Sequence, residues 1–300
     1  MSLVLFIVNP IAGKRNKFLV IREIKHFCAK NNIDYEIFYT TGNREDSYKY
    51  IKSHFDKDLK AVVAVGGDGT INEVAKAIVN TDVPLLIIPK GSGNGMARHL
   101  KVLLPTKDIL QALINGRVIN YDVGYLNDQI FLCNAGFGFD AYLANYYSHH
   151  TMRKFLPYIF AGIKALISYK PHRYTLKLQV ESSNVIFIPF LLTFANINQY
   201  GYGISINSKA RTDDGKLDVA ILRPFKLYNL PYLIFLFLRK ELDKSKFLTI
   251  IRISSCNLES RTKEFYHIDG EPFESTDTVF NIRVDKGALH CLLPEKSNYI

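Results

Sequence analysis

The stretch Val62-Val-Ala-Val-Gly66-Gly67-Asp68-Gly69-Thr70-Ile71-Asn72-Glu73-Val74 passes from an apolar run through three glycines into a helical pattern. Glycine tolerates positive φ and lets the backbone approach an anion closely. The start of the next helix presents unpaired N–H groups and a positive dipole end to such an anion. We therefore predict a buried strand, a phosphate-binding turn and a helix. The pattern is neither a P-loop nor a G-x-G-x-x-G turn, and an ordinary strand-to-helix turn capped by Thr70 or Asp68 is the alternative.

The residues around this stretch alternate short β-branched runs with helical patterns. Predicted strands are Leu3–Val8, Asp34–Tyr39, Ala61–Val65 and Leu85–Ile88, and predicted helices lie near residues 17–31, 46–55 and 70–79. Such alternation predicts parallel strands joined by right-handed crossovers in an open α/β sheet. Ligands bind beyond the carboxyl ends of the strands in sheets of this kind, which is where the glycines stand.

Beyond Tyr121 the pattern changes to longer strand-like segments. These are Arg173–Glu181, Val185–Asn196, Leu217–Leu222, Phe247–Ser254, Thr278–Val284 and Ala288–Leu293, with helices near residues 151–168 and 227–240. We predict a mostly antiparallel, β-rich second domain. The expected division is an α/β nucleotide-binding domain at 1–121 and a β-rich domain at 122–286, with residues 287–300 returning to the first domain.

The composition favours a globular protein without a membrane span. Of the 300 residues, 48% are hydrophobic, which is ample for two packed domains. The longest apolar run, Leu227–Leu238, is shorter than the roughly 20 residues of a membrane helix. The four cysteines show no metal-ligand or disulfide spacing, so we expect a cytoplasmic location.

The formal net charge of +10 directs the protein toward acidic partners. Anionic membrane surfaces, nucleic acid and nucleotide phosphates all qualify. Nucleic acid is the weakest of the three, because the chain has no run of consecutive basic residues, zinc finger or RNP motif.

Several motifs together resemble one known family. Gly66–Thr70 is similar to the signature of the diacylglycerol kinase catalytic-domain family, which is related to sphingosine kinases and more distantly to NAD kinases and phosphofructokinases. Asn9-Pro-Ile-Ala-Gly13-Lys14 resembles the family's NPxxG(K/R) element, and Pro89–Arg98 resembles its PxGTxNDxAR element. Residues 196–218 and 268–271 match its C-terminal blocks. The resemblance covers nearly the whole chain and is greatest to the bacterial soluble lipid kinases.

This resemblance implies an ATP-dependent lipid kinase that uses Mg²⁺. The residues that it implies for nucleotide binding are Asn9, Gly13, Lys14, Thr41, Gly66, Gly67, Asp68, Gly69, Thr70, Ile71, Asn72, Ser92 and Asn94. A solvated side chain is the alternative for Lys14, and a plain left-handed turn is the alternative for Ser92 and Asn94.

Phosphoryl transfer also needs a group that accepts the hydroxyl proton. The resemblance assigns this role to Glu271, with Asp269 as a rival, and lets Asp68 position the magnesium or the nucleophile. A β-turn with exposed acids is the alternative for Asp269-Gly270-Glu271. We expect the active site between Asp68 and Glu271, where the two domains meet.

The resemblance further implies a structural magnesium in the loop after Ala210. Its ligands would be the Asp214 carboxylate and the backbone oxygens of Arg211 and Lys216, and a simple Asx turn is the alternative. The family commonly has Asp where this chain has Gly95, and Asp122 is a candidate to replace that acid.

Other functions and partners stay open at this stage. A kinase of a soluble acceptor, like NAD kinase or phosphofructokinase, and a non-catalytic nucleotide-binding regulator are the alternatives. The lipid itself is open among diacylglycerol, sphingoid and polyprenol types, and a homodimer is compatible with the sequence. The protein would reach an anionic membrane through its surface, with Leu227–Leu238 either as the contact or as a buried helix.

Overall fold

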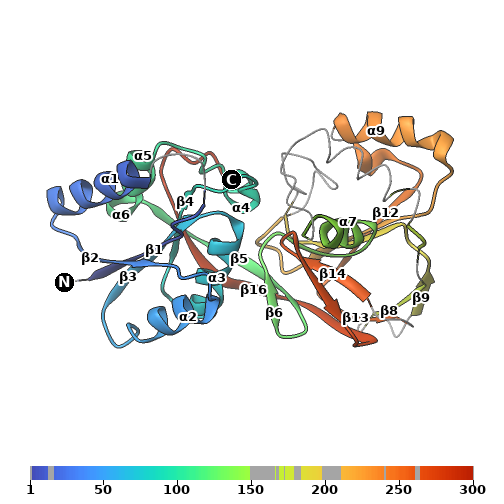
Figure 1. The fold of residues 1–300 in the computed structure, drawn as a ribbon, viewed down its shortest axis with the longest axis horizontal. Helices are drawn as coiled ribbons and strands as arrows, with labels where there is room; N and C mark the ends of the chain where they lie inside the picture. Colours follow the sequence, from blue (N-terminus) through green and yellow to red (C-terminus); the bar gives the residue numbers. More distant parts are fainter. Residues whose placement is uncertain are drawn as a thin grey trace. The chain divides into compact units, whose positions relative to one another are not determined.

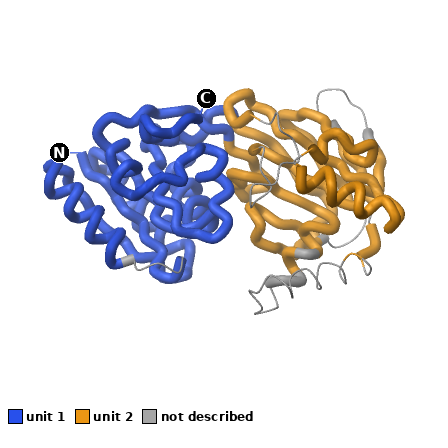
Figure 2. The backbone as a smooth tube through the Cα atoms, turned by 90° about the horizontal axis from the view of Figure 1, so that it is seen from above, with its two compact units in different colours: residues 1–122, 201–203, 286–300 blue, residues 123–200, 204–285 orange. Residues whose placement is uncertain are grey.

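The chain forms two compact units (Figures 1 and 2). This computed structural model describes residues 2–12, 17–148, 166, 169–171, 173–178, 184–197, 211–239, 241–260 and 264–299. The first unit comprises residues 1–122, 201–203 and 286–300, and the second comprises 123–200 and 204–285. Two strands, β5 (Arg117–Leu126) and β16 (Val279–Leu293), contribute residues to both units.

The first unit is built on a parallel sheet. Its strands are β1 (Leu3–Val8), β2 (Asp34–Tyr39), β3 (Leu59–Gly66) and β4 (Leu85–Pro89), in the order β2-β1-β3-β4. The end of β16 joins β4 in parallel, with Cys291 opposite Leu85. The helices are α1 (Lys17–Lys30), α2 (Arg44–Lys52), α3 (Asp68–Ile78), α4 (Gly95–His99), α5 (Thr106–Leu110) and α6 (Ala112–Asn115).

Apolar side chains on both faces of this sheet explain why helices cover both. Leu3–Val8 is buried at every position, as expected for a strand enclosed on two sides. Helices α1, α5 and α6 pack on one face, where Ile24 and Cys28 meet Val4 and Phe6, and α2 and α3 lie on the other (Figure 1). The glycine turn after β3 is thereby held at the carboxyl edge of the sheet.

The second unit is an antiparallel sandwich. One sheet has the order β12-β11-β10-β7-β14-β15. Its members are β7 (Asn134–Gly138), β10 (Leu191–Ala195), β11 (Leu217–Leu222), β12 (Leu248–Ile253), β14 (Glu264–Ile268) and β15 (Glu271–Ser275). The other layer contains β8 (Tyr174–Leu178), β9 (Asn184–Phe187), β13 (Ser255–Ser260) and the first half of β16, while β6 (Gln129–Phe131) forms a hairpin with β5.

Phe137 lies at the centre of the sandwich core. The centre of its ring lies 5.0 Å from the ring centre of Phe280, 5.9 Å from that of Tyr266 and 6.1 Å from that of Tyr174. Helices α7 (Phe139–Ser148) and α9 (Leu230–Leu238) and two 3₁₀ turns, Leu227–Asn229 and Leu242–Lys244, complete the described part of this unit. The predicted fold class, a parallel α/β domain followed by an antiparallel β-rich one, is confirmed.

Three predicted strands of the second unit were wrong in extent. The predicted strand Val185–Asn196 is two strands, because Pro189 stands between β9 and β10 and cannot donate a ladder hydrogen bond. Conversely, 278–284 and 288–293 belong to one continuous strand, which passes through Gly287 at a φ of 62°. Among the described residues, no helix is long and apolar enough to cross a membrane.

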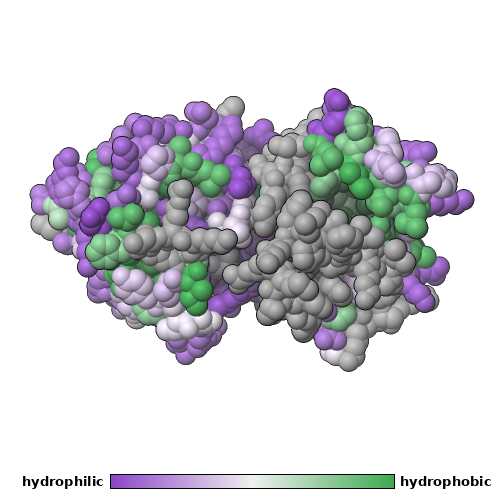
Figure 3. All heavy atoms as spheres, turned by 45° about the horizontal axis from the view of Figure 1, so that its top comes forward, coloured by the Kyte–Doolittle hydropathy of each residue, from purple (hydrophilic) through white to green (hydrophobic). Residues whose placement is uncertain are grey.

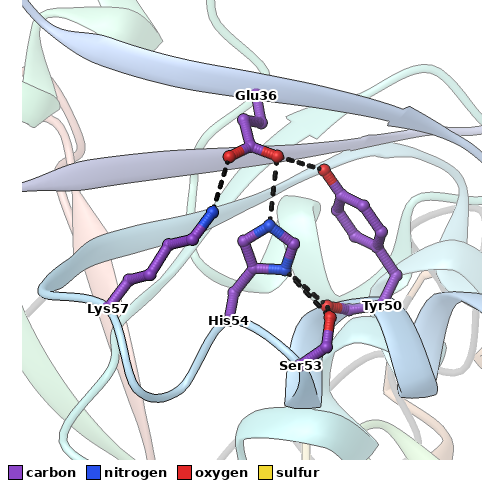
Figure 4. A network of polar contacts seen from close by, with 5 residues as sticks. All are labelled: Glu36, Tyr50, Ser53, His54 and Lys57. Carbon is purple, nitrogen blue, oxygen red and sulfur yellow. Dashed lines mark hydrogen bonds and ion pairs between the residues drawn. The ribbon is translucent and has the colours of Figure 1, made fainter.

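A polar network fastens α2 to the edge strand β2 (Figure 4). The Glu36 carboxylate accepts hydrogen bonds from Lys57 Nζ at 2.9 Å and Tyr50 Oη at 2.8 Å, and it lies 3.0 Å from His54 Nε2. The Lys57 and Tyr50 bonds lower the pKa of Glu36 to about 2, while burial and then the Glu36 bond raise that of Tyr50 to about 12.

We expect Glu36→Gln to lower the free energy of unfolding at pH 7 by about 1 kcal/mol, since Glu36 is 40% exposed and solvent screens its contacts. The pKa of Glu36 falls from 4.5 to about 2 on folding, so its contribution is complete above pH 4.5 and disappears as pH falls through 2. Urea unfolding of both proteins across this range is the measurement. Glu45→Gln on α2 is the control. If Glu36→Gln still had a lower free energy of unfolding than the unaltered protein near pH 2, the network's role would be contradicted.

Candidate active site

Two glycine-containing loops meet at the carboxyl ends of β3 and β4. The Lys90 amide donates to the Gly66 carbonyl at 2.7 Å, and a Cβ added to Gly67 would lie 3.1 Å from the Cα of Gly91. A Cβ added to Gly91 would overlap the Gly67 backbone outright. The two backbones can approach this closely only because both positions are glycine.

Asp68 links the loops electrostatically. Burial raises the pKa of its carboxyl group, while the backbone N–H groups of Gly95, Met96 and Asn94 oppose that rise. Among the described residues, its Oδ1 atom is buried without a hydrogen-bond partner. The structure holds Asp68 between the starts of α3 and α4, and its Oδ1 atom is available to a ligand.

Asn9 connects the end of β1 to the same place. Its Oδ1 accepts the N–H groups of Ile11 and Ala12 at 2.9 and 3.1 Å, and its Nδ2 donates to Thr70 Oγ1 at 3.2 Å. The Thr70 side chain also fills the space that a Cβ at Gly66 would need. The structure thus brings Asn9, Gly66 and Thr70 together.

Asn94 shapes the second loop. It has a φ of 51°, and its amide group exchanges two hydrogen bonds with the Gly91 backbone, at 2.9 and 2.8 Å. Arg98 donates to the Gly93 carbonyl at 2.9 Å and holds the loop from the other side. Asn94 therefore acts on the loop's conformation, and its side chain is engaged within the protein.

The remaining sequence-predicted nucleotide residues are placed less uniformly. Gly13 and Lys14 lie outside the described residues. Thr41 follows β2 and donates to Asp46 at 2.6 Å, and Ser92 is exposed. Gly69 and Asn72 lie in α3, partly exposed. Ile71 is fully buried and its N–H donates to Gly67, so its role is in packing.

In the second unit, Asp269 and Gly270 form a tight turn between β14 and β15. Their φ values are 49° and 85°, as a two-residue hairpin of this kind requires, and Ile268 pairs with Glu271. The Asp269 carboxylate accepts three backbone N–H groups, from Leu132, Cys133 and Asn134, at 3.0, 2.7 and 3.1 Å. Asp269 is thus committed to holding the hairpin on the segment before β7.

A buried His–Asp contact lies behind the hairpin. Nε2 of His267 lies 2.8 Å from Asp140 Oδ2, and the Gly270 N–H reaches His267 Nδ1 at 3.4 Å. A Cβ at Gly136 would collide with both partners, which explains glycine in the middle of a buried strand. Neither His267 nor Asp140 has a predicted role, because residues 127 positions apart carry no local sequence signal of contact.

The predicted magnesium loop contains an Asx turn closed by an arginine. Asp214 Oδ1 accepts the Lys216 N–H at 3.0 Å, and Asp214 Oδ2 pairs with Arg252. Arg252 also lies 3.3 Å from Asp218 Oδ1. Two carboxylates thus converge on one cation. Among the described residues, no group of three His, Cys, Asp or Glu side chains has the arrangement of a metal site.

Asp122 is fully buried on β5. Its Oδ1 accepts the Gly287 N–H at 2.8 Å, where β16 adopts a positive φ. This contact gives the carboxylate a structural task within the first unit. A role for Asp122 in metal binding stays a prediction.

The chain thus combines a parallel sheet with facing glycine loops and an antiparallel sandwich that carries a D-G-E hairpin. The chain matches the diacylglycerol kinase catalytic domain over residues 3–126 and the YegS C-terminal NAD kinase beta sandwich-like domain over residues 134–293. The chain belongs to the diacylglycerol kinase catalytic-domain family, as the sequence motifs predicted.

Curated relatives carry kinase names. A protein of Alcanivorax borkumensis named "Probable lipid kinase YegS-like" is 28% identical over 83% of this chain and 84% of its own length. A Staphylococcus haemolyticus protein named "Diacylglycerol kinase" is 26% identical over 88% of this chain and 81% of its own. The chain is therefore similar to lipid kinases over most of its length.

Solved structures agree with the fold. One crystal structure from Bacillus anthracis matches with a TM-score of 0.80 at 21% identity, covering 99% of this chain and 98% of that one. Another from the same organism, described as a diacylglycerol kinase, matches with a TM-score of 0.73 at 20% identity over the same shares. At such identity the likeness shows the fold alone.

Proposed function

We propose that the protein transfers the γ-phosphate of Mg-ATP to the hydroxyl group of a diacylglycerol-like or long-chain-base lipid. The hydroxyl oxygen attacks the γ-phosphorus, the bond to the β-phosphate oxygen breaks, and ADP leaves. Glu271 accepts the hydroxyl proton. The phosphates lie on the two glycine-containing loops, with Asn9, Gly66–Thr70 and the residues after β4.

The observation that carries this proposal is the state of Asp68. A carboxylate held at the start of two helices, with one buried oxygen free of described partners, suits an active site that organises Mg-ATP. Positioning and charge stabilisation supply most of the catalysis in phosphoryl transfer, so such preorganisation is what the reaction requires.

We expect Asp68→Asn to cut lipid phosphorylation by roughly 10²- to 10³-fold, because the amide has the same shape but lacks the charge. Folding should persist, since Asn keeps an oxygen for the amides of α4. In the assay, the protein is incubated with radiolabelled ATP and either a panel of lipids or the soluble acceptors NAD and a sugar phosphate. The label transferred to each acceptor is measured. Labelling of a soluble acceptor in place of every lipid would replace the lipid proposal, and full activity of Asp68→Asn would remove the loop argument.

Glu271→Gln should lower turnover by roughly 10²- to 10⁴-fold, as expected for loss of a general base. The KM for ATP should change little, because the substitution lies in the other unit. Asp269→Asn is the companion variant. This substitution should mainly destabilise the protein, because a neutral amide replaces the carboxylate that accepts hydrogen bonds from three backbone N–H groups. Normal turnover in Glu271→Gln with a loss in a folded Asp269→Asn would exchange the two roles.

We also propose that the 211–216 loop holds Mg²⁺. The donors present are carboxylate and carbonyl oxygens, which this ion prefers, and the convergence of Asp214 and Asp218 on Arg252 marks a place that attracts positive charge. Mg²⁺ bound there would fasten the loop to β11. These oxygen donors support the proposal.

Asp214→Ala should abolish the rise in Tm that MgCl₂ gives the unaltered protein, because an ion bound only to the native state stabilises it by mass action. Arg252→Met should enlarge that rise, since it removes a competing cation. Asp213→Ala is the matched control, because Asp213 bonds the neighbouring Arg211. Thermal unfolding with MgCl₂ or EDTA is the measurement, and equal responses in all four proteins would identify the loop as an ordinary Asx turn.

A lipid substrate lies in a membrane, so the protein must reach the membrane surface to phosphorylate it. We propose reversible association with anionic membrane surfaces, supported by the formal net charge of +10.

A further inference from the structure

Large apolar side chains are exposed on and beside α9. Leu227 is 61% exposed, Tyr228 74%, Phe235 56% and Leu238 74%. Tyr232 and Ile234 are also exposed. These six side chains are here called the α9 surface, and the space-filling view shows hydrophobic residues gathered over this helix (Figure 3).

Among the described residues, the protein core covers one side of α9. Leu233 and Leu236 are buried and pack with Ala220, Leu222 and Leu242. A surface helix ordinarily carries polar residues on its outer side. On α9 the outer side is apolar as well, and exposed apolar patches of this kind mark contacts with another molecule or a membrane.

The charged residues within the segment that contains the α9 surface are all positive. The segment 223–240 contains four basic residues and no acidic residue. Glu241 follows it directly. Lys226 Nζ lies 5.9 Å from the ring centre of Tyr228, and the Arg239 guanidinium lies 5.5 Å from that of Phe235. Arg239 also pairs with Glu241 at 3.4 Å, so Glu241 reduces the positive charge at that end.

We propose that the α9 surface is a membrane-docking element, whose apolar side chains enter the interface of an anionic bilayer while the flanking cations contact lipid phosphates. The inference rests on the proposed lipid-kinase function. An apolar helix side with a basic margin is suited to lie in the plane of the membrane interface, and tyrosines favour headgroup depth. The other side of α9 is already covered by the protein core. A symmetric contact with a second copy would bring like cations together, which disfavours that occupant.

The chain contains no tryptophan, so one introduced at the α9 surface reports on that surface alone. Phe235→Trp should show a blue shift in emission when phosphatidylglycerol vesicles are added, and bromine on the lipid chains should quench it. Ile186→Trp, at a 64% exposed position on β9 in the same unit, is the matched control and should show neither change. Vesicle binding without a shift at position 235 would overturn the proposal.

A second comparison measures the apolar contribution. The double variant Phe235→Ser, Leu238→Ser should bind phosphatidylglycerol vesicles on the order of 10- to 100-fold more weakly, because two interfacial side chains are lost. The control Ile186→Ser, Val279→Ser removes two exposed apolar side chains elsewhere in the unit and should bind normally. The double variant should phosphorylate lipid in detergent micelles normally but be slower on vesicles.

Two results would assign the α9 surface otherwise. A blue shift that grows with protein concentration without vesicles would show that a second copy covers it, and unchanged vesicle binding by the double variant would remove it from docking. The binding experiments contain no ATP. Failure to phosphorylate any lipid would therefore reject the proposed function and leave the fluorescence result standing.

Discussion

The close approach of Gly67 and Gly91 is the constraint on which the candidate nucleotide site depends. It brings two strand-to-helix turns into backbone contact, and it leaves the Asp68 carboxylate among the N–H groups at the start of α4. Any side chain at either glycine would separate the turns. These backbone donors reduce the cost of burying the Asp68 carboxyl group, but burial outweighs them and the pKa of Asp68 is raised.

In the second unit, backbone N–H groups likewise bind a carboxylate, that of Asp269 in the hairpin. Asp269 could serve in chemistry by residue type, but its oxygens are bound by three backbone N–H groups, which fixes the direction in which β15 begins. His267 on β14 contacts Asp140 and the Gly270 N–H. Both Asp269 and His267 therefore hold the turn before Glu271. A candidate catalytic side chain on so constrained a hairpin has little freedom to lose when a substrate binds.

Sequence reasoning succeeded where the signal was local. The first four strands lie within one or two residues of their predicted bounds. β1, β3 and β4 contain short apolar runs closed by glycine, proline or polar residues, and β2 is rich in aromatic and β-branched residues. It failed for β7 and β14, which are short and contain Gly136 and His267 among their apolar residues. It also misread the region around Pro189, where turn chemistry outweighed β propensity.

The sequence by itself determined the order of elements in the first unit, the glycine turns and the family, because periodicity, glycine placement and fixed motif spacing are local properties of the chain. Only the tertiary structure decided which side of α9 is covered, that Arg252 joins Asp214, and that Asp269 binds Leu132, Cys133 and Asn134. These outcomes depend on contacts between residues far apart in the chain. Whether a given side chain is buried, paired or exposed is set by what the rest of the fold places beside it.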